Sequence, residues 1–581
     1  MSHQNSSLII NFIWQVADDI LRDIYVKGKY RDVILPMVVI TRIDSELEAT
    51  KAKTIEEYKK HKDKITNIEP ILQRASGYSF YNTSPFTLKD LLKEPNNIKA
   101  NFKQYLNGFS QNIQDILTKF KFENQIQTLD ESGILFACID KFSNKSKELS
   151  PQNLSNHDMG QVFEELIRKF NEENNEEAGE HFTPREVIKL MTNILFLPVA
   201  KQIKDKPLTI YDPCVGSGGM LSIAKEFIQS DESKIHSNGT IFTFGQEVNP
   251  ETYALCKADM ILKGDSDNKV FFGSTLSNDG FQNDRFDFIL TNPPYGKSWK
   301  TDQDKLAVGK KKEIVDARFQ IGTPRINDGQ LLFMLHMLSK MKHDTPLGTR
   351  IASVHNGSAL FTGDAGSGES EIRKHIIEND YLEAIIALPK DMFYNTGIGT
   401  YIWILTNRKP KNRQGKIQLI NATGEEFFDK MTKSLGNKRN ELKPRHIENI
   451  YQIYQDFKET KTSKIFDNND FGYTQIIVER PKKDESGKAI LKKGKPESDS
   501  ELRDKENIPL KQNIEEYFKR EVLPFAPDAW ISDKERKVGY EINFNKYFYE
   551  YTPPRSLEEI KKDILALEKE TDGILKEIIE G

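Results

Sequence analysis

The spacing of apolar residues divides the chain into regions of different character. In residues 8–24, 31–48 and 100–120, apolar positions recur every three to four residues, which is typical of amphipathic helices. Polar, lysine-rich segments separate these stretches, and no strand-like alternation occurs among them. The pattern therefore predicts a helical N-terminal domain over residues 1–150.

Between about residue 205 and residue 406 the pattern changes to short β-rich runs that alternate with helical stretches. The runs are LTIYD (208–212), IFTFGQE (241–247), KVFF (269–272), FDFILT (286–291), TRIASV (349–354), EAIIAL (383–388) and TYIWIL (400–405). This alternation predicts an α/β fold with a doubly wound, mainly parallel sheet. Residues 389–399 leave no room for a crossover helix, so the last two strands are predicted to be antiparallel neighbours.

Beyond about residue 410 the chain becomes polar. Residues 482–506 form a charged, low-complexity stretch that predicts a mobile loop. In residues 556–581 apolar positions alternate three and four apart, and Ser556 with Glu559 fits a capping box. We expect a terminal helix whose apolar stripe faces a partner subunit or packs on its own domain. The predicted organisation has four parts, 1–150, 151–410, 411–555 and 556–581.

The composition is that of a globular protein with several domains. The 581 residues are 37% apolar and 29% charged, and no apolar run is long enough to cross a bilayer. The short apolar stretch from Leu8 to Val16 lacks the flanks of a signal peptide, so we expect a cytoplasmic location and no membrane partner. Cys138, Cys214 and Cys256 have neither disulfide nor zinc-site spacing, and no metal is expected.

The first candidate site is the segment DPCVGSGGM, from Asp212 to Met220. It directly follows a predicted strand and opens a helix, where glycines let the backbone pass close to a ligand. Gly216 and Gly218 do not fit the dinucleotide fingerprint, and a plain strand–helix turn is the alternative. Glu247 ends the next strand, where an acidic side chain can accept hydrogen bonds from ribose hydroxyls.

The second candidate site is TNPPYG, residues 291–296, at the end of a predicted strand. Its two prolines fix the backbone and remove two amide donors, which suits a site that accepts hydrogen bonds from an exocyclic amino group. The Asn292 side-chain oxygen and the Pro293 carbonyl can each accept one N–H, and Tyr295 offers a ring for stacking. Such a site acts by positioning and electrostatics, which make the amine lone pair available.

These two motifs together resemble the AdoMet-dependent amino methyltransferases, where AdoMet is S-adenosylmethionine. The resemblance implies a Rossmann-like methyltransferase fold in which Asp212, Gly216, Ser217, Gly218 and Glu247 bind AdoMet. It implies that Asn292, Pro293, Pro294 and Tyr295 form the catalytic motif, which holds the amine of a flipped base. Thr275, in GSTL (273–276), is expected near the adenine of the cofactor, with an ordinary turn as the alternative.

An upstream segment, GEHFTPREVIKLM (179–191), resembles the segment that precedes the first motif in the N6-adenine class. In that class it packs over the methionine part of the cofactor. The residues that match on this basis are Glu180, His181, Phe182, Thr183, Pro184 and Arg185. From the residues alone, Thr183 and Pro184 indicate only a helix start with threonine as its cap.

Three longer stretches, 327–338, 368–405 and 538–564, resemble the modification subunits of type I restriction–modification systems. The resemblance implies methylation of adenine N6 in double-stranded DNA. It also implies a separate specificity subunit that reads the sequence, two modification chains per specificity chain, and a restriction subunit with the translocating motor. The formal charge of −4 fits a chain that relies on a partner for much of its grip on DNA.

Alternatives remain at the level of sequence. The same motif occurs in methyltransferases that act on cytosine N4, on guanine in RNA or on protein glutamine, and a non-catalytic assembly scaffold is a further reading. The lysine-rich stretch 297–312 after the catalytic motif can contact phosphates or be a solvated loop.

Overall fold

The chain divides into two compact units, Met1–Ile542 and Asn543–Gly581. The computed structural model describes residues 2–144, 146–173, 183–231, 233–264, 269–309, 313–394, 397–435, 437–492, 494–533, 536–549 and 556–567. Within these ranges, no helix is long and apolar enough to cross a membrane.

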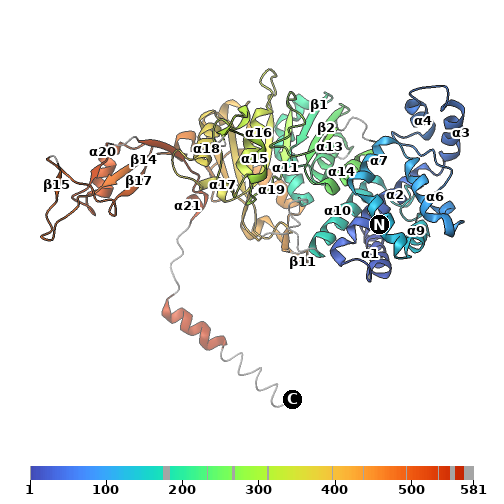
Figure 1. Ribbon diagram of the computed structural model, residues 1–581. Coiled ribbons are helices and arrows are strands. Elements are labelled where there is room, and N and C mark those ends of the chain that lie inside the picture. Colours follow the sequence, from blue (N-terminus) through green and yellow to red (C-terminus); the bar gives the residue numbers. More distant parts are fainter. Residues whose placement is uncertain are drawn as a thin grey trace, which may run out of the picture. The chain divides into compact units, whose positions relative to one another are not determined.

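The N-terminal region is helical, as predicted (Figure 1). Its helices are α1 (Ser2–Leu21), α2 (Arg31–Leu47), α3 (Lys51–His61), α4 (Glu69–Ser76), α5 (Leu88–Leu91), α6 (Ile98–Asn107), α7 (Gln111–Lys119), α8 (Phe122–Glu131), α9 (Leu135–Asn144) and α10 (Asn156–Glu173). They enclose one apolar core, in which Val39, Phe102 and Phe142 are fully buried. In the described part of residues 2–144, strand pairing is limited to one isolated bridge, Asn82 to Phe109.

The central sheet has nine strands in the order β13-β10-β8-β9-β7-β4-β1-β2-β3. Their bounds are β1 (Leu208–Asp212), β2 (Ile241–Glu247), β3 (Lys269–Phe272), β4 (Phe288–Thr291), β7 (Arg350–Asn356), β8 (Leu382–Ala387), β9 (Thr400–Thr406), β10 (Lys416–Asn421) and β13 (Ser463–Asp467). The seven predicted runs all form strands. β9 lies antiparallel between β7 and β8, which confirms the predicted antiparallel pair. The sheet continues past residue 410 through β10 and β13.

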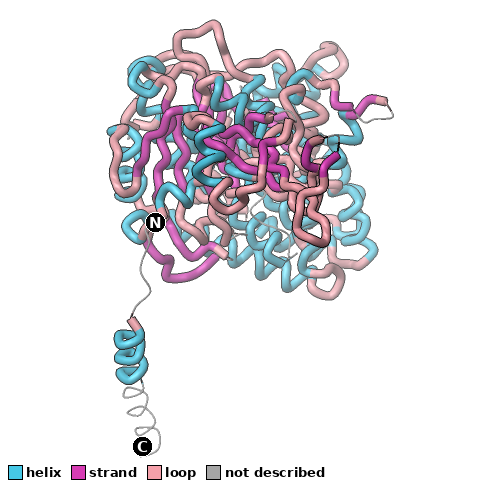
Figure 2. Tube along the Cα trace, turned by 90° about the vertical axis from the view of Figure 1, so that its left-hand side faces the viewer, coloured by secondary structure: helices cyan, strands magenta, loops and turns pink. Residues whose placement is uncertain are grey.

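Helices cover both faces of the sheet (Figures 1 and 2). The covering helices are α11 (Arg185–Phe196), α13 (Gly219–Gln229), α14 (Pro250–Leu262), α16 (Gln330–Ser339), α18 (Gly368–Glu378) and α19 (Pro444–Asp456). On one face Phe196 of α11 meets Phe288 of β4 edge-on, with ring centroids 4.7 Å apart. On the other face Tyr211 of β1 reaches His336 of α16, at 3.0 Å between Oη and Nε2. The doubly wound α/β fold is thereby confirmed.

Contacts also join the helical region to the sheet layer. α14 packs on α7 and on α10, and Ala254, Leu255 and Ala258 of α14 belong to the apolar core of the N-terminal helices. Because α14 directly follows β2, the N-terminal helices are attached close to the carboxyl end of that strand.

A second small sheet lies beyond residue 470. β14 (Gly472–Glu479) pairs with β17 (Asp504–Pro509), β18 (Trp530–Ile531) and β19 (Lys537–Tyr540). The prediction of a loop over 482–506 holds only in part, because this stretch contains the hairpin of β15 (Leu491–Lys492) and β16 (Lys495–Pro496) and the start of β17. Backbone pairing satisfies the main chain there while charged side chains stay in solvent, so the polar composition does not reveal the strands.

Shorter elements complete the first unit. They are α12 (Ala200–Ile203), α15 (Lys300–Leu306), β5 (Ala307–Val308), β6 (Glu313–Ile314), α17 (Ser358–Phe361), β11 (Asp429–Leu435), β12 (Lys438–Glu441) and α20 (Ile514–Tyr517).

The second unit contains α21 (Phe544–Phe548) and a helical segment over residues 557–567 (Figure 2). The predicted capping box is confirmed: the Glu559 amide donates to the Ser556 hydroxyl at 3.2 Å, and the Ser556 amide donates to the Glu559 carboxylate at 3.0 Å. Leu557, Ile564 and Leu567 of the heptad stripe are exposed within this unit. The remainder of the predicted terminal helix, 568–581, lies outside the described residues.

Candidate active site at the carboxyl end of the sheet

The glycine-rich turn connects β1 to α13 and is tied to the end of β2. Gly216 and Gly218 have φ of 55° and 90°, a left-handed conformation that favours glycine. The Val215 amide donates to the Gln246 carbonyl at 3.0 Å, and the Gly216 amide donates to Glu247 Oε2 at 3.0 Å. The turn therefore has a shape fixed by internal hydrogen bonds, and its residues Gly216, Ser217 and Gly219 line a cavity.

Two buried carboxyl groups stand at the ends of the adjacent strands β1 and β2. Asp212 Oδ1 accepts hydrogen bonds from the Thr291 hydroxyl at 2.7 Å and from the Cys214 amide at 2.9 Å. Burial raises the pKa of Asp212 to about 7, and the nearby charge of Glu247 acts in the same direction. Glu247 also accepts from the Asn249 amide at 2.8 Å, so both of its oxygens serve backbone N–H groups.

The two sequence motifs line two neighbouring cavities that share Cys214 and are together called the cleft. One part of it is lined by Glu164, Thr183, Ile188, Asp212, Cys214, Val215, Gly216, Ser217, Gly219, Met220 and Asn292. The adjoining part is lined by Pro213, Cys214, Gln246, Glu247, Val248, Ser274, Thr275, Leu276, Pro294, Lys297, Ser298, Trp299, Thr301, Asp302, Lys305, Gly329 and Phe333. The structure thus places Asp212, Gly216, Ser217, Asn292 and Thr183 around one part, and Glu247, Thr275 and Pro294 around the other.

Asn292 carries the clearest sign of a missing partner. Its side chain is 8% exposed, and among the described residues its buried Oδ1 has no hydrogen-bond donor. An unpaired buried acceptor is costly, so it marks a place where a donor from outside the chain would be stabilised. Pro293 and Pro294, which follow it, contribute no N–H of their own. Tyr295 is half-buried, and burial raises the pKa of its phenol, which keeps the ring neutral.

Asp328 holds the turn that follows residues 292–295, a contact that the sequence did not reveal. Its Oδ1 accepts from the Gly296 amide at 3.0 Å, directly after Tyr295. Its Oδ2 accepts from the Ser358 hydroxyl at 2.7 Å and from Gln330 Nε2 at 2.8 Å. The carboxylate thereby links the turn after β4 to the start of α16 and to α17.

The segment upstream of the first motif is only partly described. Glu180, His181 and Phe182 lie outside the described residues, Thr183 lines the cleft, and Pro184 is the N-cap of α11 without a side-chain cap bond. Arg185 forms a two-pronged ion pair with Glu164 of α10, with Nε–Oε2 at 3.0 Å and Nη2–Oε1 at 3.2 Å.

Glu164 is a lining residue that sequence reasoning missed. It lies far upstream of both motifs on α10, and only the packing of the N-terminal helices brings it to the cleft. Among the residues that the structure describes, no group of three or more His, Cys, Asp or Glu side chains is placed to hold a metal ion.

The comparisons with known proteins agree with this geometry. The sequence profile of the family described as N-6 DNA Methylase matches residues 154–475, and that of the HsdM N-terminal domain matches residues 9–142. The chain belongs to the N-6 DNA methylase family. It is an AdoMet-dependent N6-adenine DNA methyltransferase and a modification subunit of the type I restriction–modification class, as the sequence predicted.

Curated relatives and solved structures are of the same kind. The type I restriction enzyme MjaIX methylase subunit of Methanocaldococcus jannaschii is 24% identical over 505 residues, covering 82% of each chain. The MjaVIII methylase subunit of the same organism is 30% identical over 64% of this chain and 59% of its own length. A type I methyltransferase subunit from Streptococcus thermophilus shares the fold, with a TM-score of 0.62, 24% identity and coverage of 80% of this chain and 97% of that one.

Proposed function

We propose that the cleft binds AdoMet across the glycine turn and presents its methyl group to an adenine amine held by Asn292 and the Pro293 carbonyl. The observation that carries this assignment is the buried, unpartnered Asn292 Oδ1 in the same cleft as Asp212 and Gly216. A hydrogen-bond donor is missing there, and an exocyclic amine supplies one.

The residues present fit the cofactor. The backbone of the turn borders a cavity at Gly216, Ser217 and Gly219, which allows close approach of a ligand, and Glu247 stands at the strand end where ribose hydroxyls donate. Asp212 and Glu164 place carboxyl groups in the part of the cleft that faces Thr183, where a positively charged amino-acid moiety is stabilised. When bound, AdoMet supplies an activated methyl group on a sulfonium. Arg185 acts through Glu164, and Thr275 lies in the adenosine part.

The catalytic motif acts by holding the acceptor. Because an adenine amine is unreachable inside a duplex, the base must be extruded. Asn292 Oδ1 and the Pro293 carbonyl then each accept one N–H and draw the nitrogen lone pair towards the methyl group. The Tyr295 ring offers a stacking surface, and Asp328 holds the Gly296 amide so that this geometry is set before the base arrives.

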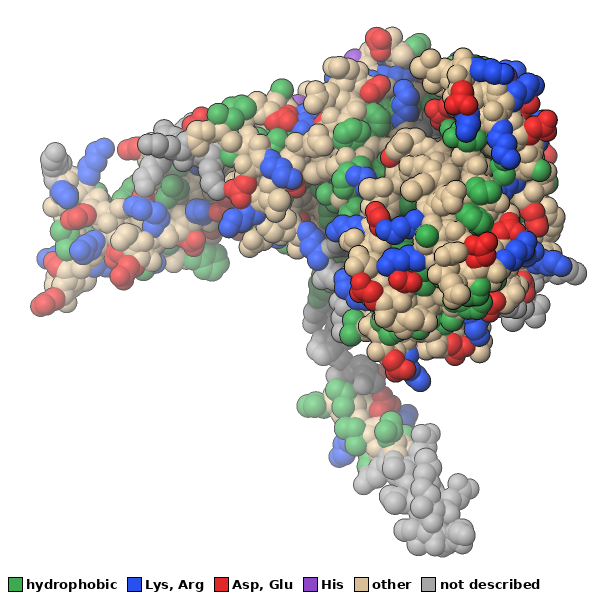
Figure 3. All heavy atoms as spheres, turned by 45° about the vertical axis from the view of Figure 1, so that its right-hand side comes forward, with side chains coloured by type: hydrophobic (Ala, Val, Ile, Leu, Met, Phe, Trp, Pro, Cys, Tyr) green, Lys and Arg blue, Asp and Glu red, His purple; other side chains and the backbone are tan. Residues whose placement is uncertain are grey.

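The proposed partners are double-stranded DNA, a specificity subunit in a ratio of two modification chains to one, and a restriction subunit with its translocating motor. The relatives' names describe them as subunits of type I restriction enzymes. The chain has a net charge of −4, and on the face seen in Figure 3 acidic and basic side chains are interspersed. The exposed stripe of Leu557, Ile564 and Leu567 suits a helical partner.

Methyl transfer from tritiated AdoMet to duplex DNA, with and without a co-expressed specificity subunit, tests the function. We expect N6-methyladenine on nucleoside analysis, and only when the specificity subunit is present. N6-methyladenine from the chain alone would contradict the proposed division of labour. Label in N4-methylcytosine, in RNA or in protein would contradict the proposed acceptor, and no transfer at all would favour a scaffold.

Deletion of residues 556–581 tests the assembly role. We expect the complex with the specificity subunit to be lost in light scattering, while AdoMet binding by the truncated chain stays within about 2-fold of wild type, since the cleft lies in the first unit. An unchanged complex mass would contradict this role.

A further inference from the structure

The segment that follows the catalytic motif holds the loop 274–277 on the adenosine side of the cleft. Asp302 of α15 accepts hydrogen bonds at its Oδ1 from the hydroxyls of Ser274 and Ser277, each at 2.6 Å. Trp299 and Asp302 themselves line this part of the cleft beside Thr275. The stretch after the catalytic motif is therefore a wall of the cofactor pocket in addition to any contact that it makes with DNA.

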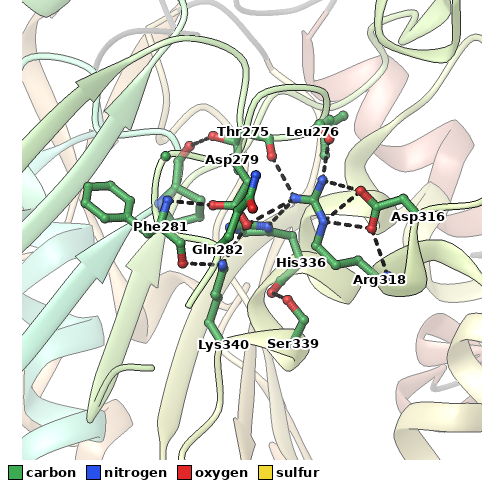
Figure 4. A network of polar contacts seen from close by, with 12 residues as sticks. Thr275, Leu276, Asp279, Phe281, Gln282, Asp316, Arg318, His336, Ser339 and Lys340 are labelled. Atoms are coloured by element: carbon green, nitrogen blue, oxygen red, sulfur yellow. Dashed lines mark hydrogen bonds and ion pairs between the residues drawn. The ribbon is translucent and has the colours of Figure 1, made fainter. Parts of the chain in front are cut away.

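Arg318 holds the same loop through its backbone (Figure 4). Its Nη1 donates to the Thr275 carbonyl at 2.9 Å, and its Nη2 donates to the Leu276 carbonyl at 2.6 Å. Asp316 fixes the guanidinium from the other side, with Nε–Oδ1 at 3.0 Å and Nη2–Oδ2 at 2.7 Å. The arginine side chain is only 13% exposed, so these bonds are sheltered from water.

A buried histidine connects Arg318 to β1. His336 Nδ1 lies 2.9 Å from Arg318 Nη1, and its Nε2 lies 3.0 Å from the Tyr211 hydroxyl. Burial, reinforced by the charges of Arg318 and Lys340, lowers the pKa of His336 well below its usual range, so the ring is neutral. Since Arg318 can only donate, Nδ1 is the acceptor and Nε2 carries the proton towards Tyr211, the neighbour of Asp212 in β1.

The peptide group between Thr275 and Leu276, which Arg318 holds at its carbonyl, has an orientation that matters for a ligand. In a planar trans peptide the N–H points opposite to the carbonyl, so the Leu276 amide points away from the guanidinium that holds the Thr275 carbonyl. No described residue accepts a hydrogen bond from that amide, and Leu276 is 2% exposed and lines the adenosine part. A fixed, sheltered donor of this kind suits an acceptor nitrogen of a purine ring.

We propose that Arg318 is a positioning residue for the cofactor: it fixes the loop 274–277 so that the Leu276 amide can bind the adenine of AdoMet. The inference rests on the proposed function, because it assumes AdoMet in this cleft. It adds that a segment downstream of the catalytic motif sets cofactor affinity.

The test compares Arg318→Lys with Arg285→Lys in the full-length chain. A lysine at 318 keeps the charge but presents one ammonium, which cannot reproduce the guanidinium fork on two carbonyls. Arg285 is an exposed arginine nearby that donates to the carbonyls of Gln282 and Asp284 at 3.2 and 2.8 Å and does not contact the loop, so it is the matched control. AdoMet affinity is measured by calorimetry, and KM and kcat are measured with the specificity subunit present.

For Arg318→Lys we expect AdoMet affinity to fall about 10-fold or more and KM for AdoMet to rise in parallel, with kcat at saturating AdoMet within about 3-fold of wild type. Arg285→Lys should match wild type. Unchanged AdoMet affinity in Arg318→Lys, or a fall in kcat without a rise in KM, would overturn the inference. If Arg318→Lys has a lowered melting temperature, Asp302→Ala, which removes the acceptor of both serine hydroxyls of the same loop, decides by the same two parameters. Failure of wild type to bind AdoMet would instead reject the proposed function.

Discussion

Within the cleft, the groups proposed to bind the cofactor (the cofactor half) and the group proposed to hold the amine (the acceptor half) differ in how their polar atoms are satisfied. On the cofactor side, the chain pairs its own groups: Glu247 holds two backbone amides, Asp212 holds a hydroxyl and an amide, and Asp302 holds two serines. On the acceptor side, Asn292 Oδ1 is buried without a partner. The proposed cofactor half is thus preorganised by internal hydrogen bonds, whereas the proposed acceptor half contains a buried oxygen that can accept a hydrogen bond from a substrate amine.

The largest expected effect comes from removing the unfilled acceptor. Asn292→Ala should lower methyl transfer by at least about 10²–10³-fold, the usual cost of deleting one preorganised polar group that acts on the reacting atoms. AdoMet affinity by calorimetry should change by less than about 2-fold, because Asn292 makes none of the hydrogen bonds that shape the turn.

Asn407→Ala is a suitable control for this variant. The Asn407 oxygen accepts from the Thr349 amide at 2.9 Å, at the other end of the sheet, so its loss should lower stability but leave kcat unchanged. A joint loss of methyl transfer and AdoMet binding in Asn292→Ala would remove the distinction between the two halves.

A substitution in the cofactor half should, in contrast, weaken AdoMet binding. Glu247→Gln keeps the shape but turns an NH₂ group towards either Gly216 N or Asn249 N, each of which now donates to a carboxylate oxygen. We expect about 10–100-fold weaker AdoMet binding by calorimetry, the range for losing a charge-assisted hydrogen bond and leaving a donor unpaired. Equal loss of AdoMet affinity in Glu247→Gln and Asn292→Ala would show that the halves are not separable.

Tyr295 should have a smaller effect, and one that depends only on its ring. Tyr295→Ala should raise KM for DNA about 10-fold, consistent with the loss of one stacking contact, while Tyr295→Phe should stay within about 2-fold. Steady-state kinetics with saturating AdoMet separate the two variants. An equal loss in both would assign the role to the hydroxyl.

The smallest expected effect is the pH dependence of AdoMet binding that results from the protonation of Asp212. The pKa of Asp212 is raised to about 7, and a cationic cofactor favours the carboxylate, so AdoMet binding should tighten as pH rises through 7. At pH 7 we expect about half a proton to be released per AdoMet, measured by calorimetry in buffers of different ionisation enthalpy. In the protein without AdoMet, the raised pKa of Asp212 adds to the free energy of unfolding. This contribution is fully present below about pH 4, the pKa of an unfolded Asp, and is lost as the pH rises through about 7. Asp212→Asn should remove the proton release.

The sequence predicted those features that depend on local pattern. β1, β2 and β3 have the predicted bounds, because each is a short apolar run between turn residues. The structure brings the predicted residues Asp212, Gly216 and Asn292 to one cavity because each sits beside a strand end, and parallel strands bring their carboxyl ends to one edge of the sheet.

Other features depend on packing between distant segments and could not be predicted. Glu164 reaches the cleft only because α10 packs with the N-terminal helices, and its ion pair with Arg185 was not predicted. Asp328 and Arg318 act on backbone groups, which leave no signature in side-chain patterns. The hairpin within 482–506 was missed because each strand has only two residues and all four are exposed, so no buried face produces an alternating pattern.

The most direct test of the central claim is a double-mutant cycle between the Asn292 side chain and the 6-amino group of the adenine. Nucleoside mapping first locates the methylated adenine, and duplexes are then made with adenine or purine at that position. Each duplex is titrated with wild type and with Asn292→Ala. Both proteins are bound to the specificity subunit and to S-adenosylhomocysteine, the product that AdoMet leaves after methyl transfer. Purine lacks only the 6-amino group. We predict that its removal weakens binding to wild type by about 1–3 kcal/mol more than binding to Asn292→Ala. Equal losses in both proteins would show that Asn292 does not hold the amine and would contradict the account.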